Sequence, residues 1–385
     1  MTWFESGLRG THPAVAVLVW LGLVAVGAAA DPEEPYVQTK EGQRAKPQVV
    51  ADNACAWPNL TVLGDGTIIA TIFNAPYHAC IVGDVDCWGS SDNGRTWEKR
   101  GTPAAHDPPS SNRMNVAAGV AGNGDLVVIS SGWLLKLKPP PADGGLQTGG
   151  LVDILEPWVC RSSDGGRTWS VDKRAMPAES PLGGPVIPFG DILSGHDGTL
   201  RVAVYTVLHR RDRKRRIWRA YVYRSRDDGK TWGEPVALDE EGPRNETALF
   251  HLGKGKWLAA ARGEGLHLYT SADDAMTWKH RMRLPVGGYP GHLARLRDGR
   301  LLLTYGTRSG TERTTKVLWS NDNGETWSRP VRVVDYHGKD GGYPSSVPLP
   351  DGQVLTAYYA KSIDGHDRYH LGVVIWEPET SFKQE

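Results

Sequence analysis

Short apolar runs interrupted by tight glycine turns recur along most of this chain. Within each run apolar and polar residues alternate, and the interruption is a pair such as Asp65-Gly66 or Asn123-Gly124. Period-two strands on either side of such a turn are typical of β-hairpins. Six of these segments occur, at residues 60–73, 116–129, 192–205, 249–261, 293–305 and 347–359. The pattern therefore predicts six hairpins.

A second motif, Ser-x-Asp-x-Gly-x-Thr-Trp, recurs between these hairpins. It is intact at residues 90–97, 162–169, 225–232 and 320–327, and a copy at residues 271–278 has Ala275 in place of the glycine. In such a turn the aspartate accepts hydrogen bonds from backbone N–H groups, the glycine supplies a positive φ, and the tryptophan packs into the sheet. We interpret each copy as the turn of another hairpin and assign it no catalytic role.

The two series together predict units of four strands. In five units the Ser-x-Asp hairpin follows the first hairpin, and the sixth unit is completed by residues 370–376 and an N-terminal strand. A supersecondary unit repeated at such intervals indicates a repeat architecture. The predicted fold is therefore all-β, a six-bladed β-propeller of four-stranded antiparallel blades that forms a single domain over residues 31–385.

The N-terminal residues are typical of an export signal. Arg9 precedes an apolar stretch at residues 14–26, and Ala28-Ala29-Ala30 offers a small-residue cleavage site. We predict a signal peptide over residues 1–30 and a secreted or periplasmic protein, with an uncleaved anchor as the alternative. No other segment of the sequence is long and apolar enough to span a bilayer once the signal is removed.

Charge and cysteine content narrow the function classes. Lys and Arg total 44 and Asp and Glu total 44, a balance that gives no indication of nucleic-acid binding. The cysteines, Cys55, Cys80, Cys87 and Cys160, permit three pairings. Pairing of Cys80 with Cys87 closes a short loop and is the first choice, and four free thiols are the alternative. The cysteine spacing fits no zinc pattern, so we expect neither a metal nor a cofactor.

Propeller geometry predicts where a site would lie. Both series of turns fall on one face, whereas first-strand entrances and second-strand exits converge on the axis at the opposite face. The entrances contribute Trp57, Asn59, Arg113, Asn115, Asp191, Glu246, His292 and Tyr343, and the exits contribute Asn74, Trp133, Tyr205, Arg262, Arg308 and Tyr359. A solvated rim is also polar, but this mixture of arginines, carboxylates, phenols and aromatic faces favours a site that binds an acidic sugar.

These residues carry a resemblance to a known family. Repeats of the Ser-x-Asp turn on a six-bladed propeller are similar to the sialidase (neuraminidase) superfamily, over nearly all of residues 31–385. The segment from Arg244-Asn245-Glu246-Thr247 to Arg262 resembles the family's fourth blade, and residues 342–352 resemble the stretch with its tyrosine nucleophile. The resemblance implies that Tyr343 attacks the anomeric carbon, that Glu246 takes the phenolic proton and that Arg262 binds a substrate carboxylate.

The chemistry of such a pair is sound. A phenol with a pKa near 10 is a poor nucleophile at neutral pH, so a neighbouring carboxylate must act as its base. An uncharged nucleophile also suits an anionic substrate, which an attacking carboxylate would repel. A core or stacking role is the alternative for an isolated tyrosine.

The arginines depart from the family's pattern. The family's first carboxylate-binding arginine is replaced by Trp57 in Ala56-Trp57-Pro58, and the region of its supporting glutamate has Tyr359. Both partners of one ion pair are therefore missing together, as in the replacement of a subsite. The third arginine corresponds to Arg308 or Arg313, of which we favour Arg308.

The proton donor for the leaving group is less clearly marked. In the family it is an aspartate in the loop after the first hairpin, where this chain has His78 by position and Asp84 a few residues later. Histidine titrates near neutrality and is a credible acid, although a loop hydrogen bond would equally explain it. His106 and Asp107, in the next connection, have a weaker claim.

The leading hypothesis is a secreted, sialidase-like glycoside hydrolase that removes a terminal acidic sugar from glycans with retention. Without the first arginine the sugar need not be sialic acid, and a uronic acid, another keto-sugar acid or a sulfated residue would also need Arg262, Arg308 and Arg113. A polysaccharide lyase, with Tyr343 or His78 as base, is one alternative. A non-catalytic propeller that binds carbohydrate or protein is another.

Overall fold

The computed structural model describes residues 34–78, 80–107, 109–135, 152–209, 216–239, 242–287, 289–308 and 312–382. The expected signal peptide, residues 1–30, lies outside them. The described part contains 24 strands and one short helix, α1 (Pro378–Ser381), so the all-β prediction is confirmed. None of its helices is long and apolar enough to cross a membrane.

Three sheets consist of four consecutive strands that pair in chain order. The first contains β2 (Asn59–Val62), β3 (Ile68–Phe73), β4 (Val85–Ser90) and β5 (Glu98–Ala104). The second contains β14 (Thr247–Gly253), β15 (Lys256–Gly263), β16 (Gly265–Ser271) and β17 (Lys279–Leu284). The third contains β18 (Gly291–Arg295), β19 (Leu301–Thr307), β20 (Thr314–Ser320) and β21 (Val331–Asp335).

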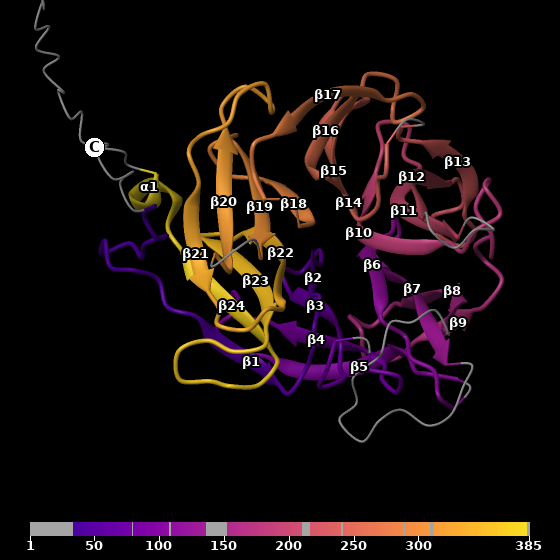
Figure 1. The fold of residues 1–385 in the computed structure, drawn as a ribbon, viewed down its shortest axis with the longest axis horizontal. Helices are drawn as coiled ribbons and strands as arrows, with labels where there is room; N and C mark the ends of the chain where they lie inside the picture. Colours follow the sequence, from indigo (N-terminus) through magenta and orange to yellow (C-terminus); the bar gives the residue numbers. More distant parts are fainter. Residues whose placement is uncertain are drawn as a thin grey trace, which may run out of the picture. The chain divides into compact units, whose positions relative to one another are not determined.

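A fourth sheet joins the two ends of the described chain. It contains β22 (Gly341–Pro348), β23 (Val354–Ala360), β24 (His370–Trp376) and β1 (Gln48–Asp52). The N-terminal strand β1 pairs antiparallel with β24, and Figure 1 shows the two side by side, indigo against yellow. This pairing confirms that an N-terminal strand completes the last unit.

The remaining eight strands form one continuous sheet, whereas the sequence predicted two separate units of four strands. It contains β6 (Asn115–Val120), β7 (Leu126–Leu135), β8 (Val152–Ser162) and β9 (Ser170–Asp172), followed by β10 (Ile187–Ser194), β11 (Leu200–His209), β12 (Arg216–Ser225) and β13 (Gly233–Ala237). The two halves join through a parallel pairing of β6 with β10. Gly119 permits this approach, because a Cβ there would lie 2.1 Å from the carbonyl oxygen of Ile192.

The first strands of successive four-stranded runs pack against one another. β2 contacts β6, β6 contacts β10, β10 contacts β14, β14 contacts β18, β18 contacts β22, and β22 contacts β2. Apolar side chains fill the space between neighbouring sheets, so inner strands such as β3, β19 and β23 are buried at every position. The ends of the first strands are therefore brought together from distant parts of the sequence.

The Ser-x-Asp turns are held as the motif predicts. In the first copy, the Asp92 carboxylate accepts hydrogen bonds from the Thr96 backbone N–H (2.8 Å) and hydroxyl (2.6 Å). Gly94 has φ +82°, and the Trp97 indole N–H donates back to its carbonyl (2.9 Å). The copies that begin at Ser162, Ser225, Ser271 and Ser320 repeat the bonds from threonine to aspartate.

The cysteines correct one prediction. All four are free, and the disulfide between Cys80 and Cys87 is not formed. The two side chains belong to different apolar clusters: Cys87 packs with Cys160 between two sheets, whereas Cys80 packs against the cluster that contains Cys55. Short sequence separation therefore does not bring Cys80 and Cys87 together.

Candidate active site

Side chains from two sheets meet at the hydroxyl group of Tyr343. Tyr343 lies near the start of β22, Glu246 immediately before β14, and Arg262 near the end of β15. The phenolic O–H of Tyr343 donates to Glu246 Oε1 at 2.6 Å, and Arg262 Nη1 donates to Tyr343 Oη at 3.1 Å and also to Glu246 Oε2. Glu246 and Arg262 are held as cross-strand neighbours, since the Arg262 backbone N–H donates to the Glu246 carbonyl (3.0 Å).

The backbone at this point is strained. Tyr343 has φ +49° and follows Gly342 at φ +96°, where the pairing of β22 with β23 shifts register. Trp57, whose ring centroid lies 6.1 Å from that of Tyr343, has φ +41°. A bulky residue with positive φ costs about 1–3 kcal/mol, and such conformations gather at functional sites. The bulge turns the phenol out of the β22 ladder toward Glu246.

Burial and charge keep the phenol protonated. Burial raises the pKa of Tyr343 well above 10, and the Glu246 carboxylate raises it further, while Arg262 and Arg308 act in the opposite direction. The hydroxyl therefore carries its proton at neutral pH and needs a base to lose it. Burial lowers the pKa of Arg262, but Glu246 and Tyr343 more than offset it, so this guanidinium stays charged.

A pocket of about 90 Å³ opens beside the pair. It is lined by Trp57, His78, Met114, Asn115, Val116, Trp133, Phe189, Tyr205, Glu246 and Tyr343. Five further residues predicted for the site, namely Trp57, His78, Asn115, Trp133 and Tyr205, are thus brought together with Tyr343 and Glu246. A wider depression, of about 810 Å³, lies among turn residues such as Asp273 and Asp322 and contains none of the predicted site residues.

Arg308 extends the site through a carboxylate that the sequence analysis missed. Arg308 Nη1 pairs with Asp340 Oδ1 at 2.7 Å, and Arg308 Nη2 donates to the Tyr359 hydroxyl at 2.6 Å. Asp340 Oδ2 lies 2.8 Å from His78 Nδ1. Burial would raise the pKa of Asp340, but His78 and Arg308 outweigh it and lower this pKa to about 2. Asp340 is therefore an anion that links Arg308 to His78.

The other candidate arginines lie elsewhere. Arg313 donates to the carbonyl of His337 (2.8 Å) and lines a depression with Lys339, Lys361 and Asp340 that does not include Tyr343. Arg113 donates to the Glu156 carbonyl (2.7 Å), and its guanidinium carbon lies 3.5 Å from the ring centroid of Trp158. Burial lowers the pKa of Arg113 to about 10. Neither arginine lines the pocket beside Tyr343.

His292 lies in a smaller cavity that shares Trp57 and Tyr343 with the pocket. Its Nε2 lies 3.0 Å from Asp191 Oδ2, and its Nδ1 accepts from the Ser346 backbone N–H (3.2 Å). Both ring nitrogens are therefore engaged in holding neighbouring strands. Asp84 is engaged as well, because it pairs with His106 at 2.7 Å.

Two features of the site had little signal in the sequence. Asp340 precedes Gly341-Gly342-Tyr343, and its nearness to the nucleophile candidate was the available clue. Tyr289 lies beneath two arginines, with its ring centroid 4.7 Å from the guanidinium carbon of Arg262 and 4.5 Å from that of Arg308.

In the described part of the chain, Cys55, His78 and Asp340 could hold a metal ion.

Comparisons with known proteins give a family and relatives for this chain. Residues 149–356 match the family described as BNR repeat-like domain. A sialidase of Paraclostridium sordellii is 26% identical over 240 residues, which are 58% of this chain and 56% of that protein, so the match spans little more than half of the relative's length.

Solved structures with the same fold include sialidases. A protein of unknown function from Dyadobacter fermentans DSM 18053 has a TM-score of 0.72 at 24% identity, covering 87% of this chain and 98% of its own. The Hadza microbial sialidase Hz136 has a TM-score of 0.62 at 19% identity, and the match covers 85% of this chain and 66% of that one. The NanB sialidase of Streptococcus pneumoniae has a TM-score of 0.64 at 12% identity, and the match covers 87% of this chain and 70% of that one. At these identities the likeness concerns the fold alone. With the family match, it shows that this chain belongs to the BNR repeat-like family of the sialidase superfamily.

Proposed function

We propose that this protein is a secreted, sialidase-like exo-glycoside hydrolase that removes a terminal acidic sugar with retention, using Tyr343 as nucleophile and Glu246 as its base. The observation that carries the proposal is the 2.6 Å hydrogen bond from the Tyr343 hydroxyl to Glu246 Oε1. A nucleophile and its base need this reach, about 2.6–3.2 Å.

The scaffold in the proposal is a six-bladed propeller. Its support is the closed series of contacts among β2, β6, β10, β14, β18 and β22, each the first strand of a four-stranded run. The eight-stranded sheet then counts as two blades joined by the close approach at Gly119. In this arrangement every blade delivers first-strand side chains to a common centre.

In the proposed reaction, Tyr343 Oη attacks the anomeric carbon while its proton passes to Glu246. Arg262 donates to Tyr343 Oη and to Glu246 Oε2, the carboxylate oxygen that does not receive the proton, so it stabilises the negative charge as that charge moves between the two groups. Water then attacks the anomeric carbon and gives a proton to His78, which has already protonated the leaving oxygen, while the departing Tyr343 oxygen takes its proton back from Glu246. Two displacements at one carbon give retention of configuration.

His78 is the proposed acid. Its imidazole lines the pocket and is held at Nδ1 by Asp340, a carboxylate that stays ionised because its pKa is about 2. An ionised carboxylate at one ring nitrogen orients the ring. His78 is therefore positioned to protonate the departing oxygen.

Arg262 and Arg308 are the proposed anion-binding residues. The sector where the family's first arginine would lie contains Trp57, whose ring meets that of Tyr359 in a T-shaped contact with centroids 5.9 Å apart. An aromatic pair thus fills the place of the missing ion pair. This difference favours an acidic sugar other than sialic acid, with a ring face that stacks on Trp57.

A Tyr343→Phe variant tests the proposal on a panel of sialosides, uronides and sulfated glycosides. We expect the rate to fall by about 1000-fold or more, since the nucleophilic oxygen is lost. Tyr358→Phe is the matched control, because its buried hydroxyl lies 3.4 Å from His370 and does not line the pocket. Full activity of Tyr343→Phe, or an ultraviolet-absorbing unsaturated product in the wild type, would contradict the hydrolase.

Export is a separate part of the proposal. It is supported by the apolar stretch at residues 14–26 and the alanines at 28–30. Expression of the full chain with its natural N-terminus should yield a secreted or periplasmic product that begins near Asp31. N-terminal sequencing checks the cleavage, and a product retained with residue 1 intact would contradict it.

A further inference from the structure

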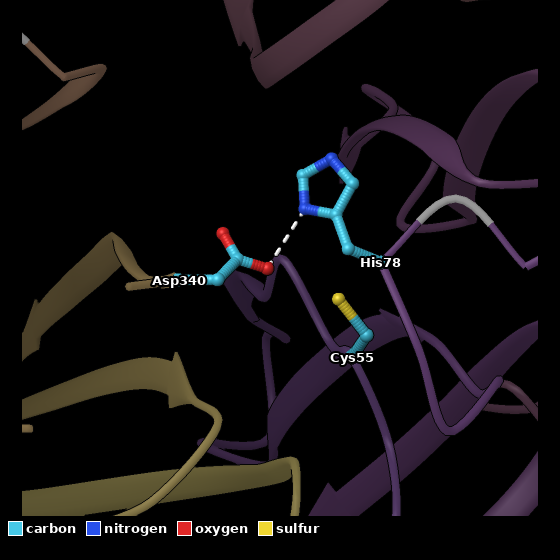
Figure 2. A group of neighbouring side chains, drawn as sticks. All are labelled: Cys55, His78 and Asp340. Atoms are coloured by element: carbon cyan, nitrogen blue, oxygen red, sulfur yellow. Dashed lines mark hydrogen bonds and ion pairs between the residues drawn. The ribbon is translucent and has the colours of Figure 1, made fainter. Parts of the chain in front are cut away.

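Three side chains of different chemistry converge beside the pocket. Cys55 comes from the segment between β1 and β2, His78 from the connection of β3 to β4, and Asp340 from the residue before β22. The sulfur, the ring nitrogen and a carboxylate oxygen all lie within 4.8 Å of one another. Figure 2 shows the Cys55 sulfur pointing toward the hydrogen-bonded pair of His78 and Asp340.

We propose that Cys55, His78 and Asp340 form a binding site for a divalent metal ion of the zinc class. A thiolate, an imidazole and a carboxylate are the three ligand types that Zn²⁺ takes in proteins, at about 2.0–2.3 Å. Ligand atoms at such lengths around a tetrahedral ion are about 3.3–3.7 Å apart. Around the ion, His78 Nδ1 and Asp340 Oδ2, now 2.8 Å apart, would separate by about 0.5 Å, and separations of up to 4.8 Å would shorten by about 1.2 Å at most.

The environment of Cys55 points to a ligand more than to a packing role. Its side chain is fully buried, takes part in no disulfide, and directs its sulfur at two polar groups. Burial raises the pKa of this thiol well above its usual range. Coordination to a metal would deprotonate the thiol, and the ion would neutralise the resulting buried charge.

Asp340 already has the outer contacts of a metal ligand. Oδ1 is held by Arg308 (2.7 Å) and by the Tyr359 hydroxyl (2.7 Å), while Oδ2 accepts from Tyr369 (3.0 Å) and faces His78. Such outer partners orient ligating carboxylates. A bound ion would take the place of the contact between His78 and Asp340 Oδ2, leaving the contacts at Oδ1 intact.

The site predicts that zinc acts as an inhibitor, a consequence that rests on the proposed function. With the ion on Nδ1, His78 can no longer cycle as the proton donor for the leaving oxygen. One equivalent of zinc should abolish hydrolysis, and a chelator should restore it. Full activity of protein that demonstrably holds zinc would overturn His78 as the acid, which is a different failure from an absence of binding.

Metal binding is tested directly on the full chain, after chelation, by calorimetric titration with Zn²⁺ and by absorption with Co²⁺. We expect one ion per chain and a thiolate-to-cobalt charge-transfer band. Mg²⁺ and Ca²⁺ should bind far more weakly, because they prefer oxygen ligands. No saturable Zn²⁺ binding, or a cobalt complex without the band, would overturn the proposal.

Variants assign the ligands. His78→Ala, at an exposed side chain, should weaken Zn²⁺ binding by about 100-fold or more, and Cys55→Ser should remove the cobalt band. His106→Ala is the matched control, because it removes a second His–Asp pair, with Asp84 at 2.7 Å, that has no thiol. Unchanged binding in His78→Ala would overturn the site even if the buried Cys55→Ser variant failed to fold.

Discussion

At the scale of single residues, the site depends on charges that are shared between neighbours. Arg262 is bonded to both Tyr343 and Glu246, and Arg308 is paired with Asp340. Each guanidinium is therefore neutralised by one carboxylate before any substrate arrives. In the proposed function, a substrate carboxylate would use the N–H groups that these pairs leave available, which five donors per arginine permit.

The role of Glu246 is tested by Glu246→Gln. The amide keeps the shape but cannot accept a proton, so kcat should fall by about 10²- to 10⁴-fold. Removing the negative charge should also lower the pKa of Tyr343, because the carboxylate raises it. Steady-state kinetics and a difference titration against Glu246→Gln/Tyr343→Phe measure both effects. An unaltered kcat would exclude Glu246 as the base.

The two candidates for the third carboxylate-binding arginine, Arg308 and Arg313, lead to opposite predictions. Arg308→Ala should raise KM for an acidic substrate and lower kcat/KM by about 10- to 100-fold, the value of one charged hydrogen-bonded contact. Arg313→Ala removes an arginine whose side chain, within the described part of the chain, donates to a backbone carbonyl near the surface, so the kinetics should not change. Equal losses in both variants would reject the placement of Arg308 as the substrate contact.

At the scale of the element, the Ser-x-Asp turn is stabilised by hydrogen bonds among its own residues. Its aspartate collects hydrogen bonds from the following threonine, and its glycine occupies a left-handed conformation. The altered copy keeps this conformation, with Ala275 at φ +66° and its threonine-to-aspartate bonds intact. The hydrogen bonds of the turn therefore tolerate a strained residue, since the tertiary packing of Ala275 holds it in place.

A pair of glycine variants separates backbone strain from packing in these turns. Gly66→Ala, at φ +85° with nothing near its Cβ, should cost about 1 kcal/mol of the free energy of unfolding. Gly94→Ala, at φ +82°, would place its Cβ 2.0 Å from Leu355 Cδ1, and should cost about 2–4 kcal/mol. Urea unfolding measures both. Equal costs would show that Leu355 moves freely, against its complete burial.

At the scale of the whole molecule, one sheet combines strands from the two ends of the described chain. β1 adds to β24, so the sheet of β22, β23 and β24 gains its fourth strand from residues more than 300 positions before their partners in β24. No local signal enforces this pairing. Because the unit is completed only when β1 docks, we expect the fold to form cooperatively.

Acid should destabilise the molecule through its repeated turns. The Thr96 hydroxyl and backbone N–H lower the pKa of Asp92 to about 2, and the corresponding threonines lower those of Asp164 and Asp322. A carboxyl with a lowered folded-state pKa stabilises the fold above about pH 4 and loses this contribution as pH falls toward 2. Thermal unfolding from pH 5 to 2 measures the decline. Asp92→Asn should flatten it, and an identical slope would contradict this origin.

Much of the fold was predictable because its signals are local. The glycine turns and the Ser-x-Asp turns are completed within a few residues, and apolar strands such as β3 and β11 follow directly from the sequence. The join between β6 and β10 was not predictable, since it depends on Gly119 meeting the backbone of a strand about 70 residues later. The failure of Cys80 to pair with Cys87 also reflects which cluster each side chain enters.

The sequence by itself determined the repeating units, the all-β class and, through family resemblance, the triad of Tyr343, Glu246 and Arg262, because those depend on short motifs. Only the tertiary structure decided which other residues share the site. It brought in Asp340, Tyr289 and Cys55 and left out Arg113 and Arg313. The physical reason is that partners such as Tyr343 and Glu246, 97 positions apart, meet through the packing of separate sheets, and no spacing along the chain encodes that distance.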